Sequence, residues 1–365
     1  MTARPSIGDL LTALGRMAPW SKAAGWDPVG LQLGDPAAPV ARVAVCHEVT
    51  ELVVEAVESQ PPDLLISYHP LLFRPTTRLV AGSSPSGRAL RLLRAGVSLA
   101  VTHTNFDVVR GGAADALADT VLLGDVVGFA PVTGPDSVKV VTFVPAEALD
   151  RVAELMGAAG AGAIGNYTHC SFRTEGTGTF FAAEGAQPAV GELEALNREP
   201  EVRLEMVAPR GREAAVVEAL VAAHPYEEPA YDVYERRGDS GMLGRIGRPP
   251  SGTTLGTMAK VVGERLGDRG LRVSGELSRE LVWVAVLPGA GSEFVEEAAG
   301  LGADLLVTGD VSHHRAREAL DRGLAVIDPG HAATERPGVQ RLYAAVAEAV
   351  QEAVDLTQLD PSPWR

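Results

Sequence analysis

A histidine and a glutamate stand four residues apart in the segment VIDPGHAATE, residues 326–335, after an apolar run that ends in Asp-Pro-Gly. If a helix begins near His331, this spacing places His331 and Glu335 on one helix face, within side-chain reach of each other. An imidazole and a carboxylate placed in this way could bind a borderline divalent metal ion. For the pair alone, the alternative is an ordinary solvated helix surface.

Further histidines and a second carboxylate follow apolar runs in the first part of the chain. In SYHPLLFRP, His69 comes directly after such a run, and in VTHTNFDVV, His103 and Asp107 are again four residues apart. Side chains that follow strands of an open α/β sheet project into the crevice where such proteins bind ligands. The alternatives are a structural hydrogen bond for His69 and a turn-capping role for Asp107.

Three imidazoles and two carboxylates are therefore expected at one edge of the sheet: His69, His103, Asp107, His331 and Glu335. Two carboxylates can bridge two metal ions, and a pair of ions about 3.5–4 Å apart lowers the pKa of a water between them and clamps both oxygens of a hydrolysed group. The sequence thus indicates metal-dependent hydrolysis. The Gly-rich segment LPGAGSEF, residues 287–294, could add backbone N–H groups for a phosphate, or could be a plain strand-to-helix turn.

Short runs of Val, Ile and Leu that alternate with Ala-rich helical stretches must position these residues, which predicts an α/β fold with sheets buried on both faces. We expect strands at 42–46, 63–67, 97–101, 281–287, 304–308 and 323–328. Two regions of the chain show the same order of a strand, a helix and a second strand that opens into a His-containing loop. The first region is DLLISYHP, RALRLLRAG, VSLAVTHTN, and the second is DLLVTGDV, HRAREALDRG, LAVIDPGH. This order favours two related βαβ lobes around one shared site, with chance similarity of composition as the alternative.

The middle of the chain, residues 137–236, has a different pattern. Its candidate strands and helices follow the order β-α-β-β-α-β, which fits a ferredoxin-like module, and the turn-rich segment GDSGMLGRIGRPPSG follows it. We therefore expect a first lobe at 1–136, an inserted α+β domain at 137–236 and a second lobe at 237–365. The two lobes would form one discontinuous domain.

Composition restricts the function classes. The net charge is −15 and no cluster of Lys and Arg is present, which argues against nucleic acid as a bulk partner. The N-terminus lacks a signal-peptide pattern and no window has the roughly 18 apolar residues of a membrane span, so we expect a cytoplasmic protein with no membrane contact. Cys46 and Cys170 are the only cysteines, too few for a thiolate cage, so a metal site must use His and carboxylate.

Six segments together resemble the dinuclear-metal-centre hexamer family, the Nif-three-like proteins, whose bacterial members are named GTP cyclohydrolase 1 type 2 homologs. The resemblance runs nearly from end to end of the chain and is specific as a set, although each segment alone is not. The segments are GWDPVGLQLGD (25–35), SYHPLLF (67–73), THTNFDVVRGGAADALA (102–118), HPYEEPAYDVY (224–234), TGDVSHHRA (308–316) and IDPGHAATE (327–335).

The resemblance implies that two divalent metal ions, of Zn, Mn, Fe or Co, are bound per chain by His69, Asp107, His331 and Glu335. Asp107 and Glu335 would be the bridges. His103 would act as a ligand or a hydrogen-bond partner at the site, and His314 is a candidate for proton transfer or support of the ligands. Many relatives have His-His-Pro where this chain has Tyr68, so one expected imidazole is a phenol.

The resemblance also implies an assembly and an activity. The assembly would be a toroidal homohexamer, a trimer of dimers, in which the insert resembles the PII and CutA folds. The activity would be metal-activated hydrolysis of a small, nucleotide-like substrate, such as opening of the imidazole ring of GTP. The alternative function is a non-enzymatic adaptor that senses a metal or a metabolite through the insert.

Overall fold

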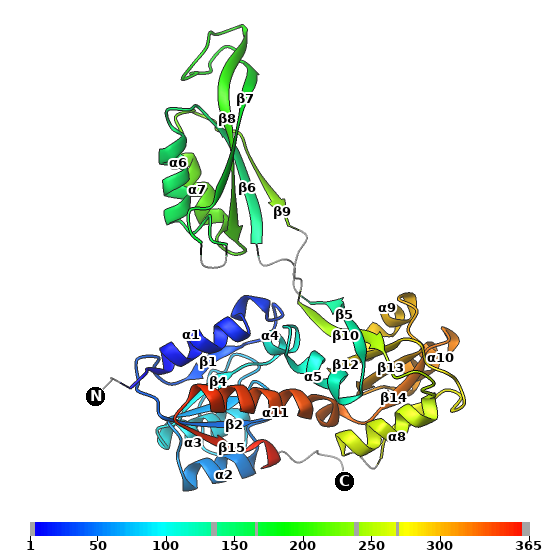
Figure 1. The fold of residues 1–365 in the computed structure, drawn as a ribbon. Coiled ribbons are helices and arrows are strands. Elements are labelled where there is room, and N and C mark those ends of the chain that lie inside the picture. The colour runs from blue at the N-terminus through cyan, green and yellow to red at the C-terminus, as the bar shows by residue number, and fades with distance from the viewer. Residues whose placement is uncertain (1–3, 133–136, 165–166, 237–240, 268–269, 360–365) are drawn as a thin grey trace. The chain divides into compact units, whose positions relative to one another are not determined.

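The computed structural model describes residues 4–132, 137–164, 167–236, 241–267 and 270–359. The chain forms two compact units, Met1–Thr133 with Gly241–Arg365, and Gly134–Ser240. The first unit contains two sheets and the second contains one (Figure 1). The expected α/β class is thus confirmed. Within the described ranges, no helix combines the length and the apolar character that crossing a membrane requires.

The first sheet has the strand order β1-β4-β3-β2-β15. All neighbours in it are parallel except β1, which pairs antiparallel with β4. Helices α1 and α11 pack on one face, and α2 and α3 pack on the other. Burial on both faces explains why these strands are continuous apolar runs. The elements are α1 (Ile7–Met17), β1 (Gly30–Leu33), β2 (Arg42–Cys46), α2 (Glu51–Ser59), β3 (Leu64–Ser67), α3 (Pro85–Arg94), β4 (Ser98–Val101), α11 (His331–Ala349) and β15 (Glu352–Asp355).

The second sheet has the strand order β11-β14-β13-β12-β10-β5, in which β12, β13 and β14 are parallel. Helices α5 and α8 pack on one face, and α9 and α10 pack on the other. In both sheets an antiparallel edge strand is followed by parallel strands, four in the first sheet and three in the second. The elements are α5 (Ala113–Thr120), β5 (Gly124–Pro131), β10 (Met242–Arg248), α8 (Leu255–Leu266), β11 (Arg272–Ser274), β12 (Val284–Ala290), α9 (Val295–Gly300), β13 (Leu305–Gly309), α10 (His313–Asp321) and β14 (Ala325–Asp328).

All six expected strands are present, although the one expected at 281–287 is β12, Val284–Ala290. The shift has a local cause. The backbone N–H groups of Val282 and Trp283 donate to the Asp304 carboxylate, at 2.8 and 3.0 Å, so ladder pairing starts only at Val284.

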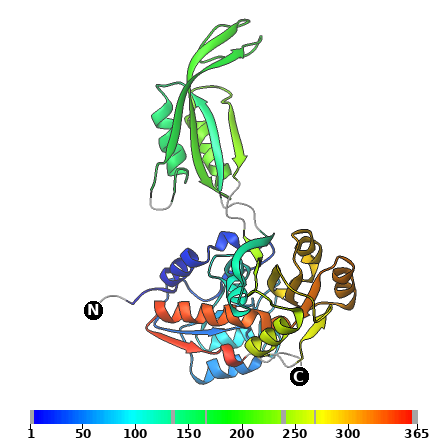
Figure 2. The same ribbon diagram turned by 45° about the vertical axis from the view of Figure 1, so that its right-hand side comes forward.

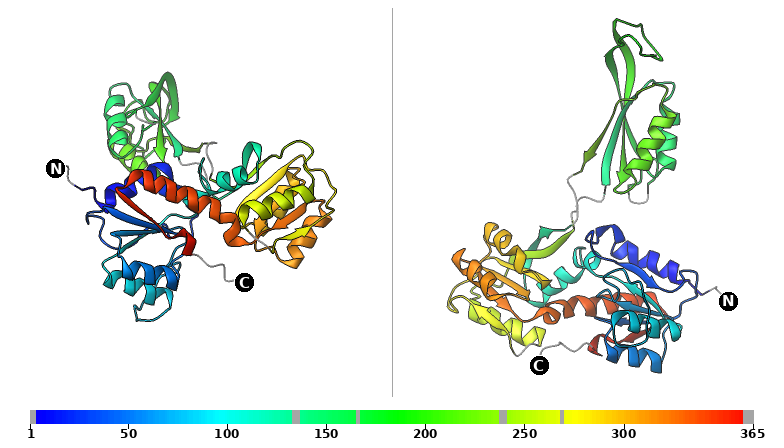
Figure 3. Two further views of the ribbon diagram at one scale, coloured as in Figure 1. Left: turned by 60° about the horizontal axis from the view of Figure 1, so that its bottom comes forward. Right: turned by 180° about the vertical axis from the view of Figure 1, so that it is seen from behind.

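Helix α11 runs between the two sheets and contacts strands of both (Figures 1 and 3). It packs closely on α5: a Cβ atom at Gly338 would lie 2.4 Å from the Cβ of Ala113. Only glycine therefore permits this approach at position 338, which brings the first turn of α11 to the carboxyl ends of the strands.

A buried arginine joins the second sheet to the loop after α4 (Thr104–Asp107). Arg245 of β10 is 5% exposed and pairs with Asp115 of α5. Its guanidinium also donates to the backbone carbonyls of Val108 and Val109, at 3.3 and 3.2 Å. Because these carbonyls directly follow Asp107, Arg245 fixes the backbone that positions that carboxylate.

The second unit has the element order β-α-β-β-α-β and one antiparallel sheet with the order β7-β8-β6-β9. Helices α6 and α7 cover one face of the sheet (Figures 1 and 2). Strands β7 and β8 continue beyond the helices as a two-stranded ribbon. The elements are β6 (Ser137–Val144), α6 (Leu149–Ala158), β7 (Ser171–Phe181), β8 (Leu196–Pro209), α7 (Glu213–Ala223) and β9 (Tyr231–Glu235).

Replacing Asp115 by alanine leaves the buried Arg245 charge without its carboxylate, so Asp115→Ala should lower the free energy of unfolding by about 3 kcal/mol. Asp119→Ala, on the same helix, is the matched control, because the pair of Asp119 with Arg341 is exposed and should contribute about 1 kcal/mol or less. Urea unfolding followed by tryptophan fluorescence reports on the first unit, which contains Trp20, Trp26 and Trp283, whereas the sequence of the second unit has no tryptophan. Equal losses in the two variants would contradict this role of Arg245.

Candidate metal centre

Parallel pairing of β2 and β3 places two histidines side by side. The pairing continues past the strand ends, where the N–H of Tyr68 donates to the carbonyl of Cys46 at 3.0 Å and the N–H of His69 donates to that of His47 at 2.9 Å. The rings of His47 and His69 are stacked, with centroids 5.1 Å apart and planes inclined by 18°. The backbone register of the first sheet therefore fixes two imidazoles at the same edge.

Glu335 is the point at which the site converges. The residue is 3% exposed and belongs to the first turns of α11, which follows β14 of the second sheet. Oε2 of Glu335 lies 2.8 Å from Nε2 of His47 and 3.0 Å from Nε2 of His69. Oε1 lies 3.0 Å from Nε2 of His331. One buried carboxylate thus meets imidazoles that come from both sheets of the first unit.

The histidines keep this carboxylate ionised. Burial alone would raise the pKa of Glu335, but the charge of His69 and the hydrogen bonds from His331 and His47 hold it well below its usual range. Burial opposes protonation of His331, yet its contacts with Glu335 and Asp310 raise its pKa to about 9. The cluster therefore presents a fixed negative charge surrounded by imidazoles.

His47, His69 and Glu335 could hold a metal ion, since one donor atom from each lies within 4.8 Å of the others. Donor atoms about 2.1 Å from a tetrahedral ion are roughly 3.4 Å apart, which this arrangement accommodates. The neighbouring backbone also leaves room, because a Cβ atom at Gly289 would lie 2.7 Å from Oε1 of Glu335. Gly289 has a φ of 71°, a conformation that glycine adopts without strain.

The Gly-rich segment that includes the end of β12 has two backbone amides that are already hydrogen-bonded to threonine side chains. The N–H of Gly289 donates to the Thr334 hydroxyl and that of Gly291 to the Thr308 hydroxyl, each at 2.9 Å. Of the two interpretations of this segment, these two amides favour the plain strand-to-helix turn, because side chains of the same unit satisfy them. Gly289 instead leaves space for the Glu335 carboxylate.

His103 lies beside the cluster and is oriented by Asp27, to which the sequence assigned no role. Its ring centroid is 5.0 Å from that of His69. Nδ1–H of His103 donates to Asp27 at 3.0 Å, and the N–H of Thr104 donates to the other carboxylate oxygen at 3.0 Å. Burial would lower the pKa of His103, but the contacts with Asp27 and Asp107 raise it overall. His103 can therefore carry a second proton on Nε2.

Asp107 is buried on the Tyr68 side of the site. Tyr68 is fully buried and its hydroxyl donates to Oδ1 of Asp107. Burial, reinforced by the charge of Glu335, raises the pKa of Asp107 to about 7. Burial and the Asp107 and Glu335 charges also raise the pKa of Tyr68 well above its usual value, so it acts as a hydrogen-bond donor. Asp107 is thus held by a phenol and lies apart from the group of His47, His69 and Glu335.

The loop after β13 contributes Asp310, whose carboxylate lies 2.7 Å from Nδ1 of His331. This contact turns Nε2 of His331 towards Glu335. His314 is exposed at the start of α10, with its ring centroid 5.6 Å from that of His313. No hydrogen bond or ring contact joins His314 to the cluster in the described part of the chain, so its catalytic role stays a prediction.

Of the five expected ligands, His69, His331 and Glu335 are joined by direct polar contacts, and His103 is in ring contact with His69. The fifth, Asp107, is hydrogen-bonded to Tyr68, whose ring contacts that of His69. His47 is the residue that sequence reasoning missed. It directly follows the buried strand at 42–46, and His69 likewise lies shortly after the end of a buried strand. The signal used for His69 could therefore have found His47.

The chain matches the sequence model of the family described as "Duf34/NIF3 (NGG1p interacting factor 3)" over residues 5–363. It is 36% identical over 356 residues to a Bacillus subtilis protein named "GTP cyclohydrolase 1 type 2 homolog", covering 96% of this chain and 95% of that one. The crystal structure of a Bacillus cereus protein related to NIF3 is similar, with 34% identity, a TM-score of 0.71 and full coverage of both chains. Staphylococcus aureus protein SA1388 has 26% identity, a TM-score of 0.78 and 99% coverage of both chains.

Loss of the His47 imidazole should weaken Zn²⁺ binding by more than about 100-fold. A loss of about 100-fold is the upper end of what is expected when only a hydrogen-bond partner of a ligand is removed. Competition with a chromophoric chelator measures this affinity in the full chain carrying His47→Ala. His313→Ala, at an exposed histidine, is the control and should leave the affinity unchanged. An unchanged affinity in His47→Ala would show that the ion does not use this imidazole.

Proposed function

Because this chain belongs to the Duf34/NIF3 family, we propose that it is a metal-dependent hydrolase that acts on a small, nucleotide-like substrate. The observation that carries the proposal is the convergence of His47, His69 and His331 on the buried carboxylate of Glu335. The name of its relatives, "GTP cyclohydrolase 1 type 2 homolog", supports a guanine nucleotide as the substrate class.

Two divalent ions, of Zn, Mn, Fe or Co, would occupy the site, with Glu335 between them. One ion would be held by His47, His69 and Glu335, and the other by His331 and Glu335, with Asp107 added to the second from the family resemblance. When bound, such ions polarise the substrate and lower the pKa of a coordinated water. Imidazole and carboxylate donors suit these borderline ions.

The two positions would differ in affinity. The first has three donor atoms already close together, whereas the Asp107 carboxylate of the second already accepts the hydrogen bond of Tyr68. An ion in the second position must compete with that bond, so we expect the first position to fill at lower metal concentration.

His103 would hold and transfer a proton. Asp27 binds its Nδ1–H, which fixes the ring and leaves Nε2 as the nitrogen that exchanges protons with a reacting group. The side of the site formed by His69 and His331 is open, with side chains 25% and 35% exposed. A site with open ligands is typical of a catalytic rather than a purely structural metal.

An exposed aromatic pair beside His103 supports a heterocyclic substrate. Trp26 is 59% exposed and Phe73 is 49% exposed, and their ring centroids are 5.9 Å apart. The centroid of Trp26 is 6.4 Å from that of His103. Stacking on such a surface tolerates any planar base, so these rings would hold the heterocycle next to the ionisable groups.

The first four strands of the two sheets, β1-β4-β3-β2 and β11-β14-β13-β12, follow the same order with the same directions, which supports related lobes at 1–136 and 237–365 that form one discontinuous domain. The β-α-β-β-α-β order of the second unit supports an inserted, PII-like domain at 137–236. A homohexamer arranged as a trimer of dimers is proposed from the family resemblance. A second candidate function, a metabolite-sensing adaptor, is favoured by a large pocket in the second unit.

The hydrolase proposal is tested by assaying metal-loaded full-length protein on a panel of nucleotides and phosphoesters. Glu335→Gln keeps the side-chain shape but removes the charge that the imidazoles surround, so turnover should fall about 100-fold or more. Glu348→Gln is the matched control on the same helix, because Glu348 is exposed, and it should retain full activity. Turnover that survives Glu335→Gln, or no turnover of any compound by the wild type, would overturn the proposal.

A further inference from the structure

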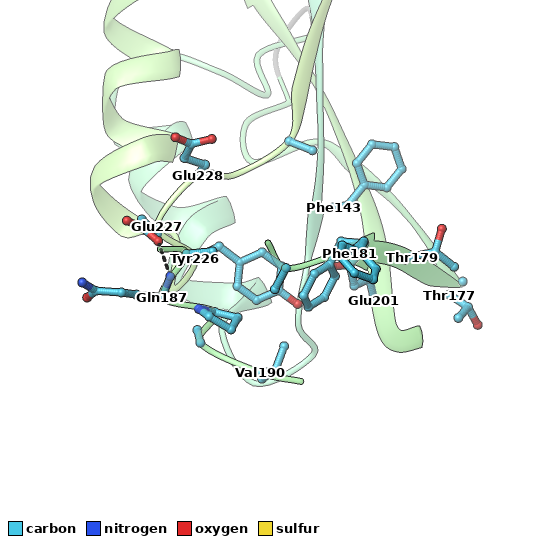
Figure 4. Close-up of a pocket in the computed structure, with 18 of the residues that line it drawn as sticks. Phe143, Thr177, Thr179, Phe181, Gln187, Val190, Glu201, Tyr226, Glu227 and Glu228 are labelled. Atoms are coloured by element: carbon cyan, nitrogen blue, oxygen red, sulfur yellow. Dashed lines mark hydrogen bonds between the residues drawn. The ribbon is translucent and has the colours of Figure 1, made fainter. Parts of the chain in front are cut away.

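The second unit contains a pocket of about 800 Å³ that is separate from the metal centre (Figure 4). Strands β7 and β8 form part of its wall, and the segments 182–190 and 226–230 complete it. Gln187 and Glu227 tie these two segments together, since the backbone N–H of Gln187 donates to Glu227 at 3.0 Å. The volume is in the range typical of small-molecule sites.

Aromatic rings line this pocket from several elements. Phe143 comes from β6, Phe180 and Phe181 from β7, and Tyr226 from the segment after α7. In Figure 4 the ring of Tyr226 lies at the centre of the labelled side chains, with Phe181 and Glu201 on one side and Glu227 on the other. The faces of such rings carry partial negative charge and attract cations.

The ionisable groups of the pocket are predominantly acidic. Among the described residues, those that line it carry four carboxylates, of Glu175, Glu201, Glu227 and Glu228, and one guanidinium, of Arg203. Arg203 is already paired with Glu205 at 2.8 Å and lies 5.7 Å from the centroid of the Phe143 ring. Its charge is therefore largely neutralised, and its position shows that the Phe143 face accepts a cation.

Glu201 and Tyr226 offer polar atoms inside the pocket. A Cβ atom at Gly178 would lie 2.1 Å from Oε2 of Glu201, so glycine at 178 leaves the space into which this carboxylate leans. The hydroxyl oxygen of Tyr226 is buried beside the Glu201 carboxylate, and burial together with that carboxylate raises the pKa of Tyr226. The Glu201 carboxylate is the group that can form a charge-assisted hydrogen bond with an ammonium ligand.

We propose that this pocket binds a small organic ammonium ion with an aryl body, whose charge lies against Glu201 and the aromatic faces and whose body fills the space between the rings. This inference is independent of the proposed hydrolase activity and gives the second unit a ligand site of its own. An anionic metabolite is disfavoured, because the carboxylates would repel it.

Calorimetric titration of the full chain with phenethylammonium tests the proposal, with 3-phenylpropionate as an anionic probe of similar size. We expect saturable binding of one ammonium ion per chain and none of the carboxylate. Glu201→Gln should weaken ammonium binding about tenfold, the equivalent of one charge-assisted hydrogen bond. Tyr226→Phe keeps the ring and should weaken it less.

Glu218→Gln removes the same charge from an exposed position on α7, outside the pocket, and should bind phenethylammonium as the wild type does. Glu335→Gln should also bind normally, which separates this site from the metal centre. The proposal is overturned if the folded wild type shows no saturable binding at millimolar ammonium, if phenylpropionate binds equally well, or if Glu218→Gln loses as much as Glu201→Gln. Binding that appears only when associated chains are dissociated also contradicts it, since the pocket would then be an interface between copies.

Discussion

A buried carboxylate is the constraint on which the first unit depends. An ionised side chain that is 3% exposed, as Glu335 is, is strongly destabilising unless opposite charges and hydrogen bonds compensate it. His47 and His69 from the first sheet and His331 from α11 provide that compensation. Because these partners follow strands of different sheets, the carboxylate is satisfied only when both sheets are folded and α11 lies between them. The convergence of three imidazoles on Glu335 therefore stabilises the buried carboxylate and also creates a group of side chains that can bind a metal ion.

The surrounding structure acts mainly by fixing directions and leaving space. Parallel pairing of β2 with β3 sets the two stacked imidazoles, Asp27 turns His103, and Asp310 turns His331. Arg245 holds the backbone just after Asp107. Gly289, by contrast, contributes to the site by having no side chain, which leaves space for the Glu335 carboxylate. Metal ligands of this kind depend on such hydrogen-bond partners for their orientation, so most of the precision of the site comes from residues that would not touch an ion.

Local pattern was sufficient to predict the six central strands and the His331–Glu335 pair, since both depend on spacing within one element. It failed where long-range contacts decide. The role of Asp27 arises from hydrogen bonds to residues more than 70 positions away. The Tyr68–Asp107 bond joins the residue after β3 to the last residue of α4, 39 positions away. The amides of Gly289 and Gly291 looked available for phosphate because their threonine partners are distant in sequence. His47 is different, because the strand before it was predicted and only the residue after that strand was overlooked.

The measurement that tests the central claim most directly is anomalous diffraction at the zinc edge from crystals of the zinc-loaded protein. We expect a strong peak within bonding distance, about 2.0–2.2 Å, of Nε2 of His47, Nε2 of His69 and Oε2 of Glu335. A weaker peak is expected on the His331 side of the same carboxylate. A peak coordinated by other residues, or density showing Glu335 still in direct hydrogen bonds with the histidines at saturating zinc, would contradict the claim that this carboxylate organises a metal centre.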